Sequence, residues 1–157
     1  MTIDGNYDDP DDDTTIGTQS PQPAPKLPRP DDNMLAKRWL FNNPYTAWGM
    51  GEWRQYKNGV WQKVEADFIK NNIKKIVEVA AREGVRCTAN LVNSVAELAR
   101  LEISIPSETW DASPSFLPCK NGVLDITSRT LLPHTPLIYA TSQLSFDYDA
   151  NADCPAF

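Results

Sequence analysis

The densest group of potential metal ligands lies near the C-terminus, in the stretch DYDANAD. Asp147, Asp149, Asn151 and Asp153 are spaced like ligands 1, 3, 5 and 7 of a calcium-binding loop. The sharp turn of such a loop requires glycine at its sixth position, where this chain has Ala152. We therefore expect a turn rich in Asp and Asn, and we predict no metal site.

Two of these carboxylates, Asp147 and Asp149, could instead hold the divalent ions of a nucleotidyl transferase. Such a site also needs further carboxylates and phosphate-binding cations, and only Lys120 and Arg129 are close in sequence. None of the seven glycines precedes a lysine, so a phosphate-binding P-loop is excluded. The single histidine, His134, leaves little room for a catalytic triad. We predict no catalytic residue and no cofactor, and we do not expect the chain to be an enzyme on its own.

A second candidate site combines basic and aromatic residues. The Asn-Gly pair at 58–59 predicts a type I′ hairpin that pairs Tyr56 with Trp61 and Arg54 with Lys63. All four side chains then share one face, as in binders that stack single-stranded nucleic acid on aromatic rings. The competing interpretation, which we favour, is that the rings belong to the core. The candidate nucleic-acid-binding residues, each basic or aromatic, are Arg54, Tyr56, Lys57, Trp61, Lys63, Lys70 and Lys74.

Two amphipathic helices are predicted after the hairpin. The first covers 65–83 and is ended by Gly84, and the second runs from Thr88, as N-cap, to Glu102. The apolar stripe of the first helix is Ile69, Ile73, Ile76, Val77 and Ala80. The inner line of the second is predicted to be Leu91, Val95, Leu98, and Leu101 or Glu102, with Val92 adjoining.

Short strands are predicted at 116–119, 123–126 and 130–132, and one more within 136–149. The sequence KNGV occurs twice, at 57–60 and 120–123, in unrelated surroundings. We interpret the two copies as one turn used twice. A hairpin, two helices and small antiparallel β elements together predict an α+β fold.

Residues 1–33 differ in composition from the rest of the chain. They hold eight acidic and two basic residues, which accounts for the whole net charge of −6. An aspartate run and a proline-rich stretch predict a disordered acidic, Pro-rich tail before one domain at 34–157. No apolar run is long enough to span a membrane, and Cys87, Cys119 and Cys154 form no metal-binding pair. We expect a protein of the cytoplasm with free thiols.

The last third of the chain resembles a segment shared by phage, plasmid and poxvirus primase–helicases. That segment has the form NGVLDL-x-T-G-x-L-x-PH followed by YDP-x-A-x-C-P, and it lies just upstream of a superfamily-three helicase core. The residues that carry the motif here are Asn121, Gly122, Asp125, His134, Tyr148, Asp149, Cys154 and Pro155. The Thr-Gly pair of the pattern is Ser128-Arg129 here, and Ala150 stands where proline is common.

The resemblance implies an accessory domain of DNA replication, similar to a linker or collar between a primase and a hexameric ATPase. Its expected role is to help assemble or orient a helicase ring, and its expected partner is the helicase ATPase of the same system. Self-association and contact with single-stranded DNA are further expectations. The resemblance also implies a protein of a mobile element that acts in the cytoplasm of a bacterial host, and it leaves open a truncated chain, a split gene product or a prophage remnant.

Overall fold

The computed structural model describes residues 1–2 and 29–152, and it confirms the predicted α+β class. The predicted disordered tail falls mainly on residues 3–28, outside the described part of the chain. The helices and strands are α1 (Asp32–Asn42), β1 (Thr46–Gly49), β2 (Glu52–Lys57), β3 (Val60–Val64), α2 (Ala66–Val79), η1 (Ala80–Glu83), α3 (Ala89–Glu102), η2 (Ser107–Thr109), β4 (Phe116–Cys119), β5 (Gly122–Asp125), β6 (Thr130–Leu132) and η3 (Pro136–Ile138).

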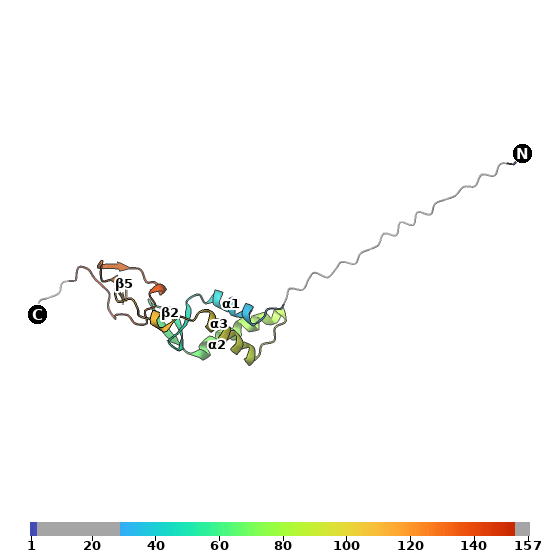
Figure 1. Ribbon diagram of the computed structural model, residues 1–157, viewed down its shortest axis with the longest axis horizontal. Helices are drawn as coiled ribbons and strands as arrows, with labels where there is room; N and C mark the ends of the chain where they lie inside the picture. The colour runs from blue at the N-terminus through green and yellow to red at the C-terminus, as the bar shows by residue number, and fades with distance from the viewer. Residues whose placement is uncertain (3–28, 153–157) are drawn as a thin grey trace.

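The elements follow one another along a long axis (Figure 1). The three α-helices form one end, the sheet β1-β2-β3 lies next to them, and the sheet β4-β5-β6 forms the other end. The first sheet therefore has a helical neighbour and a β neighbour. We call the segment from Trp110 to Ala152, which contains the second sheet, the β module.

Helix α1 was not predicted as a helix. The sequence patterns indicated only that the chain is ordered from about residue 34. Its N-cap is Asp31, whose carboxylate accepts the Met34 amide at 2.8 Å. Helix α1 therefore includes Asp32 and the residue after it, which the sequence boundary had placed in the tail. Leu35 and Trp39 of this helix are fully buried, so α1 supplies part of the core.

The hairpin of β2 and β3 has the predicted register. Tyr56 pairs with Trp61 and Arg54 with Lys63. The turn residues Asn58 and Gly59 have φ values of 52° and 87°, as a type I′ turn requires. Strand β1, which was not predicted, adds a third antiparallel strand to this sheet.

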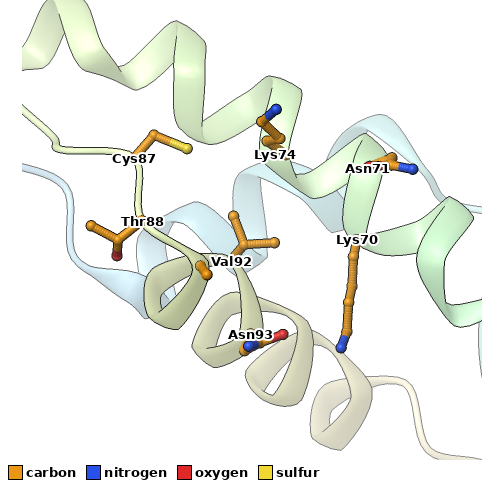
Figure 2. A pocket seen from close by; sticks show the side chains of 8 residues that line it. Lys70, Asn71, Lys74, Cys87, Thr88, Val92 and Asn93 are labelled. Atoms are coloured by element: carbon orange, nitrogen blue, oxygen red, sulfur yellow. The ribbon is translucent and has the colours of Figure 1, made fainter.

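Helices α2 and α3 lie side by side, with the start of α3 at Thr88 below α2 in Figure 2. The Thr88 hydroxyl accepts the Leu91 amide at 3.2 Å, which confirms the predicted N-cap. Gly84, at φ 83°, ends the preceding helical segment as predicted. The predicted stripe is confirmed at Ile69, Ile73, Val77 and Ala80, which have no exposed surface, whereas Ile76 is only partly buried.

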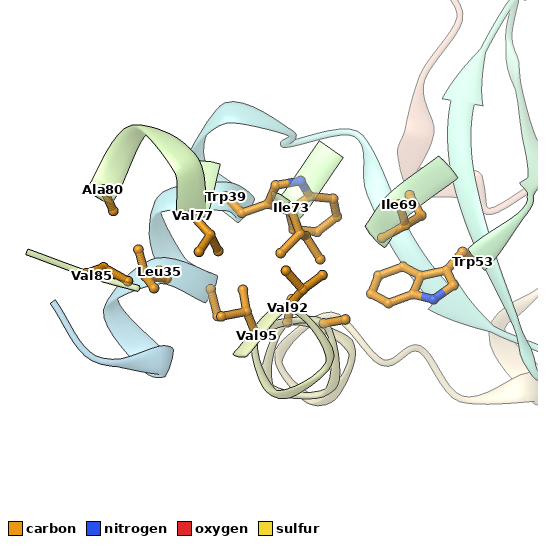
Figure 3. Close-up of a cluster of buried hydrophobic side chains, with 13 residues drawn as sticks. Leu35, Trp39, Trp53, Ile69, Ile73, Val77, Ala80, Val85, Val92 and Val95 are labelled. Atoms are coloured by element: carbon orange, nitrogen blue, oxygen red, sulfur yellow. The ribbon is translucent and has the colours of Figure 1, made fainter. Parts of the chain in front are cut away.

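The predicted inner line of α3 was wrong in part. Leu101 is 64% exposed, whereas Ala96 and Ala99 are buried with Val92 and Val95. Helix α3 packs on both α1 and α2, so its buried face is turned toward a helix that the sequence patterns did not identify. Figure 3 shows Val92 and Val95 pointing at residues of α1 and α2 in this core.

The second sheet has the three predicted strands, but no further strand forms within the described residues after β6. The segment near residue 144 runs beside β4 instead, with the Leu144 amide donating to the Pro118 carbonyl at 2.8 Å. Because proline has no N–H, Pro118 cannot return a hydrogen bond. A regular ladder is interrupted at this edge.

Candidate functional site

The aromatic face of the hairpin is covered by the β module. The Trp61 ring stacks on Tyr139, with ring centroids 6.0 Å apart, and meets Trp110 edge-on at 5.8 Å. Its Nε1–H donates to the Pro136 carbonyl at 2.9 Å, and only 5% of Trp61 is exposed. Tyr56 packs against the same cluster, where burial raises the pKa of its hydroxyl. These rings act as core between the first sheet and the β module, the interpretation favoured above.

Arg54 is also buried and makes its contacts within the domain. It is 9% exposed, its guanidinium lies over the Trp110 ring at 5.2 Å, and it reaches the Glu52 carboxylate at 3.6 Å. Lys63 pairs with the other oxygen of Glu52 at 2.6 Å. This hydrogen bond lowers the pKa of Glu52 and raises the pKa of Lys63. Arg54, Tyr56 and Trp61 therefore do not form an open stacking platform in this structure.

The remaining candidate cations lie elsewhere. Lys57 sits over the Phe68 ring at 5.8 Å, near the start of α2. Lys70 and Lys74 lie one turn apart on α2 and line a cavity between α2 and the start of α3 (Figure 2). The structure thus separates the seven candidate nucleic-acid-binding residues into two groups. Arg54 and Trp61 are buried and Tyr56 is partly buried, whereas the four lysines are exposed.

The residues of the C-terminal motif, by contrast, are brought together. The Asn121 side-chain amide donates to the Tyr148 carbonyl, and its oxygen accepts the Tyr148 amide, both at 2.9 Å. This pair of bonds imitates the pairing of two strands. Next to it, the Lys120 amide donates to the Phe146 carbonyl at 3.2 Å. Together these bonds fix the segment that runs from 144 to 148.

His134 joins the two KNGV turns. Its Nε2–H donates to the carbonyl of Lys120, in the second copy, at 3.1 Å. Its ring lies against Gly59, in the first copy, so closely that a side chain at Gly59 would overlap the imidazole. The two turns are unrelated in sequence context, yet both contact the same side chain.

Gly122 and Asp125 shape the second sheet. A Cβ atom on Gly122 would overlap the Leu132 carbonyl, so glycine allows β5 and β6 to approach closely. The Asp125 carboxylate accepts the Thr127 amide at 2.9 Å and the Ser128 hydroxyl at 2.8 Å. The hydrogen bond from the Ser128 side chain is the largest cause that lowers the pKa of Asp125.

Of the remaining acidic candidates, Asp149 forms a turn. The Asp149 carboxylate accepts the Asn151 amide at 2.8 Å, in the Asx turn that the sequence favoured over a calcium loop. Burial, and then the charge of Asp147, raise the pKa of the Cys119 thiol. The motif residues Cys154 and Pro155 lie outside the described residues. Among residues 1–2 and 29–152, no cluster of three or more potential metal ligands occurs, and no helix could span a membrane.

Sequence reasoning missed one polar contact of the β module. Asp111, whose φ is 53°, accepts the Thr141 amide at 2.8 Å and the Thr141 hydroxyl at 2.6 Å. It follows Trp110, which packs on Trp61 and Tyr139. Asp111 and Thr141 are 30 residues apart, and no local pattern marked the pair.

The fold and the site define a class of protein: a small α+β domain whose motif residues hold its own chain in place. A family model described as "D5 N terminal like" matches residues 45–157, and the chain belongs to this family, the pre-helicase domain of phage and plasmid primase–helicase proteins. The chain is thus a primase–helicase-associated replication domain. No curated protein matches it. Helix α1 lies before the matched residues but contributes Leu35 and Trp39 to the core.

Proposed function

We propose that this domain is an adaptor in DNA replication that docks on the helicase ATPase of its own system and helps to assemble or orient the helicase ring. The family supports a helicase partner. The observation that carries the proposal is the fixing of residues 144–148 by Asn121 and the neighbouring backbone bonds. A segment held in this way keeps a defined position on the domain, which a rigid adaptor requires.

The β module also exposes apolar side chains that a partner would cover. Leu137 is 77% exposed and Phe146 is 57% exposed, and Ile126 and Leu132 of the same module are exposed too. Beside Leu137 lies a groove of about 350 Å³ lined by Tyr45 and several other apolar residues. An exposed apolar side chain at the edge of such a groove, as Leu137 is, suits a protein–protein contact.

The test is association of the purified chain with the ATPase of its own system. We expect a complex by analytical ultracentrifugation, and Leu137→Ser with Phe146→Ser should weaken it at least about tenfold, since interface anchors commonly contribute more than 1 kcal/mol each. Phe41→Ser is the matched control, because Phe41 is 86% exposed on α1, outside the β module. A chain that remains monomeric with no affinity for the ATPase contradicts the proposal.

Single-stranded DNA binding is the second candidate, and one observation favours it. Lys70 and Lys74 lie on one face of α2, where two ammonium groups can follow a phosphate backbone. We expect weak, salt-sensitive retention of a dT oligonucleotide that falls in Lys70→Gln and Lys74→Gln. Unchanged fluorescence anisotropy at low salt contradicts it.

A further inference from the structure

An apolar cavity with a positively charged edge lies between α2 and the start of α3 (Figure 2). Its volume is about 370 Å³, its wall includes Val92 and Cys87, and Lys70 and Lys74 lie at its edge. Within the described residues Lys70 forms no ion pair, and Lys74 reaches Glu78 at 3.5 Å on an exposed surface. An occupant that suits this site combines an apolar group with adjacent negative charge.

The N-terminal tail contains a segment with that chemistry. Tyr7 is followed directly by five aspartates within residues 8–13. A tyrosine ring buries a large apolar area at a low entropic cost, because only two χ angles are fixed. The aspartates next to the ring are negatively charged and can pair with the positively charged ammonium groups of Lys70 and Lys74.

The described chain resumes at Arg29, close to this cavity. The Arg29 guanidinium lies beside Gly84, and Cys87 of the cavity wall follows only three residues later. Asp13 is 16 residues before Arg29, a stretch that spans about 50 Å when extended at about 3.1 Å per residue. A tether of this length keeps the segment within reach of the cavity, so that docking is an intramolecular event. Weak contacts are therefore sufficient for occupancy.

We propose that the cavity between α2 and α3 is the docking site of the chain's own segment 7–13, with the Tyr7 ring against Val92 and the aspartates on Lys70 and Lys74. The docked tail and a nucleic-acid backbone compete for the same two lysines. The inference is independent of helicase docking, because the residues that line the cavity and the exposed apolar residues of the β module are different sets.

Cys87 provides a probe of occupancy at the cavity wall. The rate of Cys87 alkylation by iodoacetamide is measured in the full chain by mass spectrometry, which separates this cysteine from the other two. Occupancy should slow alkylation about three- to tenfold at low salt, as expected for a few weak contacts made intramolecular, and 1 M NaCl should remove most of the protection. Tyr7→Ala changes no charge and should restore fast alkylation, and Lys70→Gln should do the same.

Two matched controls separate docking from general electrostatics. Ile16→Ala removes another apolar side chain of the tail, and Lys75→Gln removes a charge from α2 outside the cavity; neither should change the rate. Equal effects of Tyr7→Ala and Ile16→Ala, or of Lys70→Gln and Lys75→Gln, overturn the proposal. Protection that rises with protein concentration means a second copy as occupant. Protection given by a dT oligonucleotide alone, and unaffected by Tyr7→Ala, means a nucleic-acid occupant; both outcomes also overturn it.

Discussion

The His134 imidazole packs directly on Gly59, so the turn of the first hairpin is in contact with the β module. The same ring donates a hydrogen bond to the Lys120 carbonyl at 3.1 Å. One side chain therefore connects the type I′ turn, which the sequence indicates clearly, to the family motif. The contact fixes the β module against the first sheet together with the cluster around Trp61.

Gly59→Ala should destabilise the domain for two separable reasons. A side chain at φ 87° costs about 1–2 kcal/mol in backbone strain, and overlap with His134 adds about 1–3 kcal/mol. The free energy of unfolding is measured by urea denaturation. In a His134→Ala background the overlap disappears, so the same Gly59 substitution should cost only the strain.

Gly51→Ala is the matched control for that experiment. Gly51 also has a positive φ, 77°, but apart from its two chain neighbours no residue lies within 4 Å of the position of its Cβ. Gly51→Ala should therefore cost only the backbone strain, both in the parent chain and in the His134→Ala background. Equal losses for Gly59→Ala with and without His134 contradict a structural contact between the two turns.

Asn121→Ala should release the segment around Tyr148. The substitution removes two hydrogen bonds, each with a net value of about 0.5–1.5 kcal/mol, so we expect a loss of about 1–3 kcal/mol. Hydrogen exchange of the Tyr148 amide is the more specific measurement, because that amide has Asn121 as its acceptor. Asn93→Ala, on the exposed side of α3, should change neither quantity. An unchanged Tyr148 amide in Asn121→Ala contradicts the clamp.

The parts of the fold that could be predicted from the sequence are those with a local cause. Asn58-Gly59 determines both the turn and the register of the hairpin, and Thr88 and Gly84 mark helix ends by their own hydrogen bonding and φ. No local signal determines which face of α3 is buried. Apolar residues occur all around that helix, and its packing on α1 decides which of them are buried.

The candidate site also combines residues that the sequence predicts with long-range contacts that it does not predict. The aromatic face of the hairpin was predictable, but its cover comes from Trp110 and Tyr139, far along the chain. The bond between Asn121 and Tyr148 joins positions 27 residues apart. The resemblance marked both as motif residues without indicating that they bind each other. A motif identifies such residues, and their roles follow only from the contacts.

The corrected face of α3 is open to a simple test. Ala99→Leu should destabilise by about 1–3 kcal/mol, because a larger side chain does not fit a close-packed interface. Leu101→Ala should stay within about 0.5 kcal/mol of the parent chain, as is usual for an exposed position. Thermal unfolding of the two variants measures both effects. A larger loss of stability for Leu101→Ala than for Ala99→Leu would instead support the buried face of α3 that periodicity alone predicts.

Asp125 should make stability depend on pH in the acidic range. Hydrogen bonds hold the pKa of this carboxyl below its ordinary value, about 3.9 for an unperturbed aspartate. The folded state therefore binds the proton less tightly than the unfolded state. The stabilisation is fully present above the ordinary pKa and is lost as the pH falls through the lower folded value. The difference in Tm between the parent chain and Asp125→Asn should shrink as the pH falls from 5 to 2, and a constant difference contradicts the assignment.

Trp61→Ala should unfold or loosen the contact between the first sheet and the β module. The substitution removes a buried ring that touches Trp110 and Tyr139, and such changes cost about 3–5 kcal/mol. Trp61→Phe keeps a ring but leaves the Pro136 carbonyl without its donor, so its loss should be smaller. Near-ultraviolet circular dichroism and urea denaturation measure both. If Trp61→Ala is as stable as the parent chain and loses only affinity for an oligonucleotide, the ring is a binding surface and not core. A large loss of stability means instead that any loss of DNA binding in this variant reflects the fold.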